Sequence, residues 1–402
     1  MITFLRFPKY KSDWLEANID DIAKVTSGGT PSRSNNEYWG GNIPWITTSQ
    51  INFKDIIEAE EFITETGLKN SSAKLFSKGT ILLALYGQGI SRGRVSVLEI
   101  DATTNQACAA IILKSTKTNI RFIFYYLQSK YEEIRNLAND GGQKNLSGGL
   151  VKTLPVVYPD CEKEQQKIAS FLTSVDSKIS QLTEKHRLLK EYKKGVMQQV
   201  FSQQLRFKDK DGKDFPEWEE IRFGDFLTLD LRKVTKPGEK FLALGVRSHV
   251  KGVFHKPNFD PQKIAMEELY VVKKDDLVLS ITFAWEGAIA IASNIDEGGL
   301  VSHRFPTFIF ELDKVTPDFF KHVIPNLKLR YILGNISPGG AGRNRVLNKN
   351  DFLKIKWNMP SLKEQQKIAQ FLQSIDKKID TVAQQVEQTK QFKKGLLQQM
   401  FV

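Results

Sequence analysis

Polar and basic side chains are concentrated in the glycine-rich loops of this 402-residue chain. Arginine, lysine, asparagine and glutamine have hydrogen-bond donors that match the edges of guanine and adenine, and lysine and arginine also neutralise phosphate. The formal net charge of +12 points to a polyanionic partner. A solvated surface role competes with DNA contact for any single residue, so the prediction of a DNA interface rests on the whole set.

The candidate DNA-contacting residues share these side-chain types and lie in loops or at strand ends. In the first half they are Thr30, Ser32, Arg33, Asn35, Asn36, Thr47, Thr48, Gln50, Gln88, Arg92, Arg94, Lys144 and Asn145. In the second half they are Arg247, His249, Lys251, His255, Lys256, His303, Arg343, Asn344 and Arg345.

No arrangement of residues in the sequence predicts catalysis. There is no Walker loop and no Asn-Pro-Pro-Tyr motif, and Gly87-Gln88-Gly89 before Gly93 matches a dinucleotide fingerprint only loosely. The histidines lack metal-ligand spacing, and the two cysteines, Cys108 and Cys161, cannot form a zinc cluster or a disulfide framework. We therefore predict no catalytic residue, no metal site and no cofactor bound by this chain.

One long stretch occurs twice and must position these loops. Residues 164–201 recur at 364–401 without a gap, and about half of the positions are identical, mainly at the two ends. Both copies have apolar residues at alternating steps of four and three, which predicts long helices with a coiled-coil seam. The seam residues are Ile168, Leu172, Val175, Ile179, Leu182, Leu189, Ile368, Leu372, Ile375, Ile379, Val382 and Val386. Two core helices of one globular domain are the alternative, but polar residues on the other faces favour an antiparallel pair.

Three details of the repeated helices set further expectations. Lys193 and Lys393 interrupt the seam, and Ser361 with Glu364 has the spacing of a capping box, for which Cys161 leaves the first copy incomplete. Gly195 and its repeat mate Gly395 each cost a helix about 1 kcal/mol relative to alanine. A glycine retained in both copies indicates either a close approach of another backbone or an early helix end.

The repeat extends beyond the helices and predicts an α+β fold with internal pseudo-two-fold symmetry. Leu5-Arg6-Phe7 matches Leu205-Arg206-Phe207, so the chain resembles two units in a ring that has been cut open. We predict a first globular domain over 1–158, a helical spacer over 159–203, a second globular domain over 204–360 and a second helical spacer over 361–402.

The first globular unit is expected to contain short strands and one helix. Apolar runs predict strands over 42–51, 78–87, 92–100 and 107–114, and a helix over 119–138. The second unit repeats this plan with different residues: 269–281 parallels 75–85, 288–296 parallels 95–101, and the loop 337–346 stands where 139–148 does. One frame therefore carries two divergent binding surfaces.

Composition agrees with a folded protein of the cytoplasm. The chain is 41% hydrophobic and 26% charged, and it has no apolar segment long enough to cross a bilayer and no apolar signal core at residues 1–11. We expect no membrane partner.

The sequence resembles a known family, the specificity (S) subunits of Type I restriction–modification systems. The stretches that carry the resemblance are residues 27–51, 105–113 and 159–172, and the repeat of the last at 364–372. The resemblance implies that each globular unit is a target recognition domain for one half of a bipartite double-stranded DNA sequence. It also implies that the two helices are the conserved regions that space these domains.

The resemblance further implies partners that perform the chemistry. Two methylation (M) subunits would bind S-adenosylmethionine and methylate adenine, and restriction (R) subunits would add ATP- and Mg-dependent translocation and cleavage. The chain itself would be a non-catalytic recognition subunit. Two alternatives are a stand-alone DNA-processing enzyme such as a nuclease, which lacks support from motifs, and a scaffold whose two domains bind proteins, which the basic charge disfavours.

Overall fold

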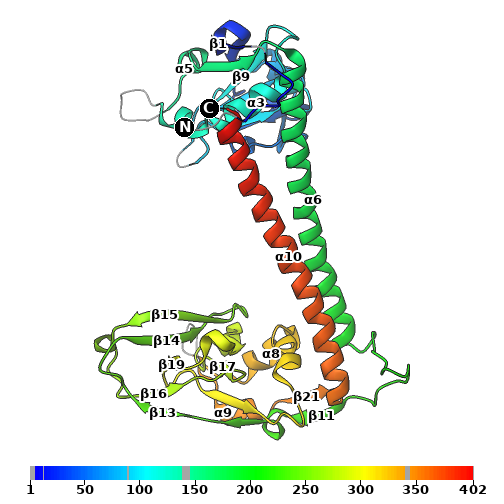
Figure 1. Ribbon diagram of the computed structural model, residues 1–402, viewed down its shortest axis with the longest axis vertical. Helices are drawn as coiled ribbons and strands as arrows, with labels where there is room; N and C mark the ends of the chain where they lie inside the picture. The colour runs from blue at the N-terminus through cyan, green and yellow to red at the C-terminus, as the bar shows by residue number, and fades with distance from the viewer. Residues whose placement is uncertain (1–4, 12, 88–89, 138–144, 340–344, 402) are drawn as a thin grey trace. The chain divides into compact units, whose positions relative to one another are not determined.

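The computed structural model describes residues 5–11, 13–87, 90–137, 145–339 and 345–401. It has the predicted α+β fold, with short-stranded sheets and two long helices, α6 (Glu162–Phe201) and α10 (Leu362–Met400) (Figure 1). The chain forms two units, Met1–Lys185 with Val382–Val402, and His186–Thr381. Each unit thus consists of one globular part and a portion of both long helices. The prediction from the sequence instead divides the chain linearly and gives each long helix a separate segment, 159–203 or 361–402.

The first unit contains two four-stranded sheets. Their orders are β2-β9-β6-β7 and β4-β3-β8-β5, and β1 pairs separately with β10. The elements are β1 (Trp14–Asn18), α1 (Ile19–Ile22), β2 (Ala23–Ser27), η1 (Asn36–Tyr38), β3 (Trp39–Ile46), η2 (Thr48–Gln50), β4 (Glu61–Ile63), α2 (Glu65–Lys69), β5 (Leu75–Phe76), β6 (Ile81–Ala84), β7 (Val95–Val97), β8 (Ala102–Thr104), β9 (Cys108–Leu113), α3 (Ile120–Ser129), α4 (Tyr131–Asn136), α5 (Gly148–Lys152) and β10 (Pro155–Pro159).

The second unit repeats this topology with one additional edge strand, β13. Its sheets are β12-β20-β17-β18 and β13-β16-β19-β14-β15, and β11 pairs separately with β21. In each unit the second sheet contains one parallel pair, β3·β8 or β14·β19. The elements are β11 (Glu219–Arg222), η3 (Phe223–Asp225), β12 (Leu227–Leu229), β13 (Lys233–Thr235), β14 (Phe241–Val246), β15 (Val253–Phe259), η4 (Pro261–Lys263), β16 (Glu268–Val271), β17 (Leu277–Leu279), η5 (Ala284–Glu286), β18 (Ile289–Ile291), η6 (Asn294–Asp296), β19 (Leu300–Val301), β20 (Thr307–Phe310), α7 (Pro317–Val323), α8 (Leu327–Asn335), α9 (Lys349–Leu353) and β21 (Lys356–Met359).

The two predicted strand parallels between the halves are confirmed by this topology, whereas the predicted parallel between the loops 337–346 and 139–148 lies partly outside the described residues. Strands β5 and β6 of the first unit correspond to β16 and β17 of the second, and β7 corresponds to β18. The sequence repeat is therefore a repeat of strand order as well as of the long helices.

Within each unit the long helices pack antiparallel through the predicted seam. In the first unit Ile168, Leu172 and Val175 of α6 share a core with Leu396 and Met400 of α10. In the second unit, Ile368, Leu372 and Ile375 of α10 share a core with Val196 and Val200 of α6. Of the remaining seam residues, Leu182, Ile379 and Val382 are buried, while Ile179, Leu189 and Val386 are half-buried.

Two repeat-related ion pairs connect the helices where lysines interrupt the seam. Lys393 Nζ lies 2.7 Å from Asp176 Oδ1 in the first unit, and Lys193 Nζ lies 2.6 Å from Asp376 Oδ1 in the second. Lys393 is 8% exposed and also lies 5.1 Å from the centre of the Tyr125 ring. Each lysine is thus paired with the aspartate that the repeat supplies on the other helix.

A buried glutamate near the start of each long helix holds the segment that precedes the globular part. Arg6 Nε donates to Glu164 Oε1 at 2.6 Å, and Arg206 Nε donates to Glu364 Oε1 at 3.0 Å. These hydrogen bonds raise the pKa of both guanidinium groups. Trp218 Nε1 also donates to Glu364 Oε2, at 3.2 Å. The matching Leu-Arg-Phe segments therefore have a structural role.

The next residue in each helix, Gln165 or Gln365, binds only backbone atoms of its own unit. The amide nitrogen of Gln165 donates to the carbonyls of Pro159 and Lys117, and its oxygen accepts from the Asn119 N–H. Gln365 makes the same three bonds, to the carbonyls of Pro360 and Lys314 and from the Thr316 N–H. This identity explains why the Glu-Gln pair is retained in both copies.

The predicted capping box at Ser361 is wrong. The Ser361 hydroxyl oxygen is buried and has no hydrogen-bond partner among the described residues, while Glu364 is bonded to Arg206 and Trp218. The tertiary partners of Glu364 therefore replace the local capping interaction that its spacing suggests.

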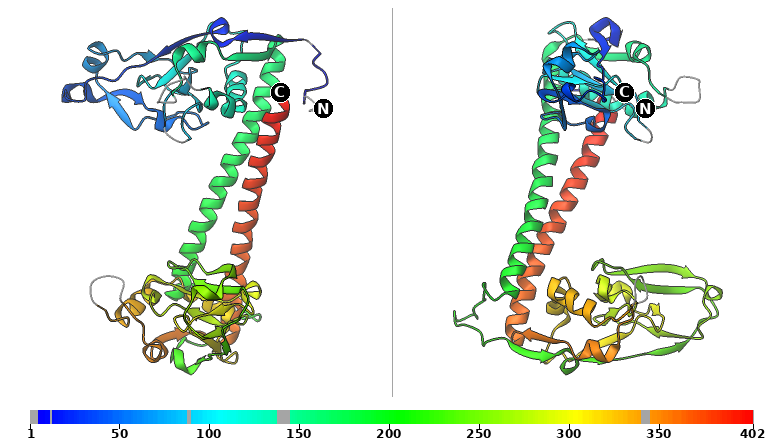
Figure 2. Two further views of the ribbon diagram at one scale, coloured as in Figure 1. Left: turned by 90° about the vertical axis from the view of Figure 1, so that its left-hand side faces the viewer. Right: turned by 180° about the vertical axis from the view of Figure 1, so that it is seen from behind.

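The ends of the two long helices confirm the cut-ring arrangement. In the second unit, Leu205 N–H donates to Gln199 O of the helix that immediately precedes it. In the first unit the equivalent bond runs from Leu5 N–H to Gln399 O of α10, 2.8 Å away. Figure 2 shows the start of the first unit beside the end of α10. Phe401 then packs edge-on against Phe122 and Tyr126.

The predicted elements of the first unit are shorter than the sequence pattern indicates. The strand over 78–87 is reduced to β6, and the strand over 107–114 is reduced to β9. The helix over 119–138 divides into α3 and α4 at Lys130, whose φ of −89° and ψ of 11° depart from helical values. The strand over 92–100 is reduced to β7, since Gly93 has a φ of 83°. The strand over 42–51 ends at Ile46, before the 3₁₀ turn η2.

No helix in the described ranges is long and apolar enough to cross a membrane.

Candidate nucleic-acid interface

The polar loop between β2 and β3 is held by its own side chains. Thr30 Oγ1 donates to Gln106 Oε1 at 2.6 Å, Ser32 and Ser34 share a hydroxyl contact, and Asn35 Oδ1 accepts from Glu37 N–H at the start of η1. A Cβ on Gly28 would lie 2.0 Å from Thr104 O, so this loop needs glycine to pack against β8. Asn36 is exposed at its tip.

Arg33 is fixed by the same loop. Its guanidinium lies 3.7 Å from the centre of the Trp39 ring and forms an ion pair with Glu61. The side chain remains 54% exposed. Nearby, the hydroxyls of Thr47 and Ser49 contact each other beside Thr48, and Gln50 donates to Glu58 O. These predicted residues therefore have local partners and would present a preformed surface to a ligand.

Arg92 and Arg94 lie in the loop between β6 and β7, and Arg94 lies beside an aromatic ring. The Arg94 guanidinium is 5.7 Å from the centre of the Phe53 ring, which contacts the Tyr131 ring edge-on at 5.1 Å. The Arg135 guanidinium lies 6.0 Å from the centre of the Tyr131 ring. We call Phe53, Arg92, Arg94, Tyr131, Arg135 and Asn145 the first basic–aromatic cluster.

Asn145 joins this cluster through the backbone. Leu146 N–H donates to Leu85 O at 3.0 Å, which places Asn145 beside the loop that carries Arg92 and Arg94. Sequence positions separated by about 50 residues are thereby brought to one end of the sheet that contains β6.

A comparable group forms in the second unit. The Arg345 guanidinium lies 5.1 Å from the centre of the Trp285 ring, and Arg330 on α8 lies 3.5 Å from His249 Nδ1. Tyr331, the neighbour of Arg330, is 70% exposed. We call His249, Trp285, Arg330, Tyr331 and Arg345 the second basic–aromatic cluster. All but His249 line an open groove of 690 Å³.

The two clusters occupy the same place in the two units. Gly93 and Gly287, both with φ near +80°, end the loops that follow β6 and β17. Leu347 N–H donates to Ile281 O at 2.8 Å, just as Leu146 N–H donates to Leu85 O. Each unit thus presents cations beside aromatic rings at the equivalent edge of the equivalent sheet, although the residues differ.

The remaining candidates of the second unit lie mainly on the β14–β15 hairpin. Arg247 and Lys256 both approach the Phe254 ring, at 5.7 and 5.5 Å from its centre. His255 points elsewhere, because its Nε2 is 2.6 Å from Asp296 Oδ1. Burial opposes ionisation of Asp296, but hydrogen bonds from Ser293 and His255 outweigh it and lower the pKa of this carboxyl.

Two further candidates, Lys251 and His303, are exposed in turns. Gln88, Lys144, Arg343 and Asn344 lie outside the described residues.

Comparison with known proteins gives the decisive observation. The family model described as the Type I restriction modification DNA specificity domain matches residues 11–191 and 216–391. The chain belongs to this family. The two matches of the specificity domain cover both globular parts and most of both long helices, as the internal repeat requires.

Named relatives of this specificity-domain chain agree with the match. This chain is 31% identical over 264 residues to the Type I restriction enzyme MjaIX specificity subunit of Methanocaldococcus jannaschii. The aligned region covers 61% of this chain and 60% of that relative. The chain thus spans less than two thirds of that relative's length. It is 23% identical over 413 residues to the MjaVIII specificity subunit of the same organism, covering 98% of this chain and 92% of the relative.

Solved structures agree in fold. The S subunit of a Type I restriction–modification system from M. genitalium matches all of this chain and 99% of its own, with a TM-score of 0.60 and 16% identity. The HsdS subunit from Thermoanaerobacter tengcongensis covers 98% of both chains, with a TM-score of 0.52 and 14% identity. The family match and the named relatives favour a specificity subunit over the nuclease and the protein scaffold.

Several residues of this specificity-domain chain were absent from the sequence prediction. The sequence prediction searched glycine-rich loops for polar and basic side chains, so it missed the aromatic residues Phe53 and Trp285. It also missed the residues that lie on helices, which are Tyr131 and Arg135 on α4 and Arg330 and Tyr331 on α8. A usable signal was present for α8, where Leu327 and Tyr331 put two apolar side chains, 75% and 70% exposed, one turn apart.

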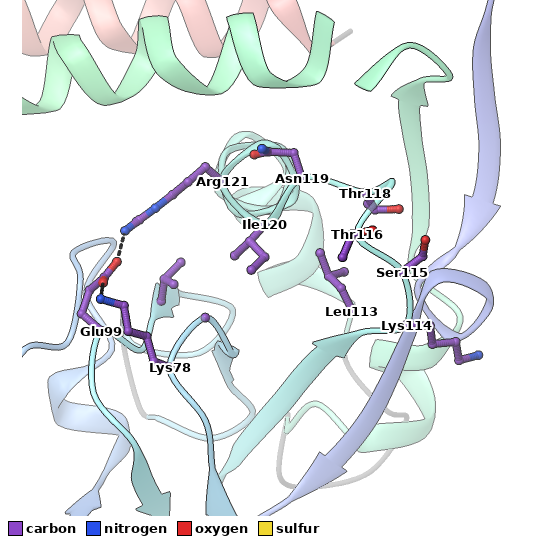
Figure 3. A pocket seen from close by; sticks show the side chains of 12 residues that line it. Lys78, Glu99, Leu113, Lys114, Ser115, Thr116, Thr118, Asn119, Ile120 and Arg121 are labelled. Atoms are coloured by element: carbon purple, nitrogen blue, oxygen red, sulfur yellow. Dashed lines mark hydrogen bonds and ion pairs between the residues drawn. The ribbon is translucent and has the colours of Figure 1, made fainter. Parts of the chain in front are cut away.

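The first unit has a hollow of 580 Å³ at the start of α3 (Figure 3). Lys78 and Arg121 flank Glu99 there, and the hydrogen bond from Lys78 lowers the pKa of the Glu99 carboxyl. Arg121 also pairs with Asp55. Because Lys78 and Arg121 are both matched by carboxylates, these ion pairs tie α3 to the β7–β8 turn, and the hollow offers less to an anion than the clusters do.

Proposed function

We infer that this chain is a specificity subunit of a Type I restriction–modification system, with two DNA-recognition domains. The observation that carries the inference is the pair of basic–aromatic clusters at equivalent positions of two units that share one topology. Arginine beside an aromatic ring is held in a defined position, and its guanidinium can still bind guanine edges or phosphate.

Each cluster would read one half of a bipartite double-stranded DNA target. The side chains of the two clusters differ, whereas the loops that carry them are anchored by the same backbone hydrogen bonds. Divergent side chains on a shared frame suit two different half-site sequences. We propose that the loop at Arg33 and the β14–β15 hairpin extend these two surfaces.

The chain would supply recognition, and its partners would supply chemistry. Methylation subunits would bind S-adenosylmethionine and modify adenine, and restriction subunits would use ATP and Mg. In the described ranges, no group of three or more His, Cys, Asp or Glu side chains could hold a metal ion. We also propose a cytoplasmic location, where such a complex meets DNA.

The test uses Arg94→Ala and Arg345→Ala in the complex reconstituted with methylation subunits. Loss of a base contact should cost about 1–3 kcal/mol and relax one position of one half-site, and loss of a phosphate contact should reduce the salt slope by about one unit. Methylation-site sequencing and DNA binding at two salt concentrations would measure both. Lys210→Ala, on an exposed loop outside the clusters, is the matched control.

The two variants should affect opposite halves of the target. A change in both halves from either substitution, or unchanged binding from both, would contradict the assignment of one cluster to each half-site. Thermal unfolding of each variant separates loss of contact from loss of folding.

A further inference from the structure

The exposed side of α8 carries two large apolar side chains. Leu329 and Leu333 on the opposite side of this helix are buried in the core of the second unit. Leu327 and Tyr331 lie four residues apart and are 75% and 70% exposed. Residues four apart are neighbours on a helix, so the two side chains form one apolar surface about one turn long. Contact of this surface with water is unfavourable, which indicates a partner that covers it.

The surroundings of this apolar pair are cationic. Leu327 and Tyr331 line the groove of 690 Å³ together with Trp285 and the two cations of the cluster, Arg330 and Arg345. Among the described residues that line this groove there is no carboxylate, and α8 contains no acidic residue. Charge complementarity therefore favours a polyanion, and the function proposed above supplies one in double-stranded DNA.

The width of α8 decides which groove of the DNA it can enter. A helix with its side chains is about 10–12 Å across. The major groove of B-DNA is about 12 Å wide, whereas the minor groove is about 6 Å wide. Only the major groove therefore admits α8 with its exposed side toward the base edges. The apolar group that base edges present there is the C5 methyl group of thymine.

The first unit uses its corresponding helix differently. Helix α4 follows α3 as α8 follows α7. Tyr131 of α4 packs its ring against Phe53, with 5.1 Å between the ring centres, and its hydroxyl donates to Ile90 O. That aromatic side chain is held inside its own unit, whereas Tyr331 is left for a partner. The apolar pair is thus one of the features that differ between the units, as residues that read different half-sites should.

We propose that Leu327 and Tyr331 bind the methyl group of a thymine in the half-site that the second unit reads. This proposal rests on the function proposed above. The methyl group packs between the two side chains, and Arg330 and Arg345 contact phosphate or guanine at flanking positions. The pair selects thymine through an apolar contact, so the specificity of this half-site does not depend on hydrogen bonds alone.

The experiment compares thymine with uracil, which lacks only that methyl group. Each thymine of a target found by methylation-site sequencing is replaced singly, and the Kd of the complex reconstituted with methylation subunits is measured. At one position of one half-site, uracil should weaken binding about fourfold, the effect of one methyl group missing from a buried contact. Leu327→Ala with Tyr331→Ala should weaken binding of the thymine duplex, and uracil should then have no further effect.

A matched variant controls for the loss of exposed apolar surface. Leu312 is 64% exposed in the second unit and does not line the groove, so Leu312→Ala should retain the fourfold preference for thymine. All three altered side chains are exposed, and the melting temperatures of both variants should match that of the unaltered chain. The uracil comparison on the unaltered chain needs no substitution and is therefore independent of folding.

Other results would overturn the thymine contact. If no uracil weakens binding, or if the double variant keeps the fourfold preference, the pair does not read a methyl group. If uracil has no effect but the double variant binds more weakly and bends the DNA less, the pair is a wedge between base pairs. If the double variant loses methylation subunits from the complex, the pair binds protein. If the unaltered complex shows no sequence preference at all, the proposed function itself fails.

Discussion

His322 on α7 should make the second unit sensitive to acid. Its side chain is buried, and its Nε2 has no hydrogen-bond partner in the part of the chain that the structure describes. Burial, with the nearby charges of Lys193 and Lys321, lowers its pKa from 6.5 to about 4, and Asp376 and Asp318 only partly oppose this. Folding therefore keeps His322 neutral at a pH where the unfolded chain would protonate it.

The sign and size of the effect follow from that difference. Because the pKa in the folded state is the lower one, stability is complete above about pH 6.5 and is lost as the pH falls toward 4. Between pH 7.5 and pH 5.0, the free energy of unfolding should fall by about 2 kcal/mol on account of this residue.

The residue at the equivalent position of the first unit suggests a substitution that removes the pH dependence caused by His322. That residue is Tyr125, whose hydroxyl donates to Asp176 Oδ2 at 2.8 Å. In His322→Tyr, the new hydroxyl would have Asp376 as its equivalent acceptor, and the imidazole that gains a proton on unfolding would be gone. The variant should match the unaltered chain at pH 7.5 and exceed it by about 2 kcal/mol at pH 5.0.

Urea unfolding of both chains at the two pH values is the assay. The difference between the chains cancels the titration of every group that they share. A difference that does not change between pH 7.5 and pH 5.0 would refute a neutral buried His322. Tyr125→Phe, in the first unit, should show no such pH dependence and serves as the control.

Three further predictions concern packing. Asp176→Asn should destabilise the first unit by about 2 kcal/mol in thermal or urea unfolding. Asp376→Asn should destabilise the second unit less, because Lys393, the partner of Asp176, is more buried than Lys193, the partner of Asp376. Equal losses of stability would contradict this. Phe401→Ala should cost about 3–5 kcal/mol in urea unfolding, since the ring is 3% exposed in the first core, and a near-neutral result would be inconsistent with that core. Gly28→Ala should lower the melting temperature by the equivalent of about 1–3 kcal/mol through overpacking, and a rise would show that the loop can move away from β8.

The regular parts of the fold could be predicted because periodicity is a local property. Heptad spacing located Ile168, Leu172 and their repeat mates, and continuous apolar runs located β6 and β9. The points at which helices begin and end were less predictable. The break at Lys130 lies inside a segment that reads as one helix in the sequence, and the partner of Glu364 is Arg206, which is 158 residues away in sequence.

The candidate site could be predicted only in part, for the same reason. Side-chain type pointed to Arg92, Arg94 and Arg345, which the structure places in the clusters. It also selected His255, which pairs with Asp296. The aromatic partners were out of reach, because Phe53 meets Tyr131 only after two sheets and α4 have packed together.

The two buried glutamines near the starts of the long helices have an evolutionary consequence. Gln165 and Gln365 bond to carbonyl and amide groups of the main chain, so the joint between helix and globular part does not depend on which side chains that part carries. Any segment that brings the same turns to this point can be attached. Recombination between genes could therefore exchange a whole recognition domain in one event, and point mutations could alter its surface freely, while the joint that holds it stays the same.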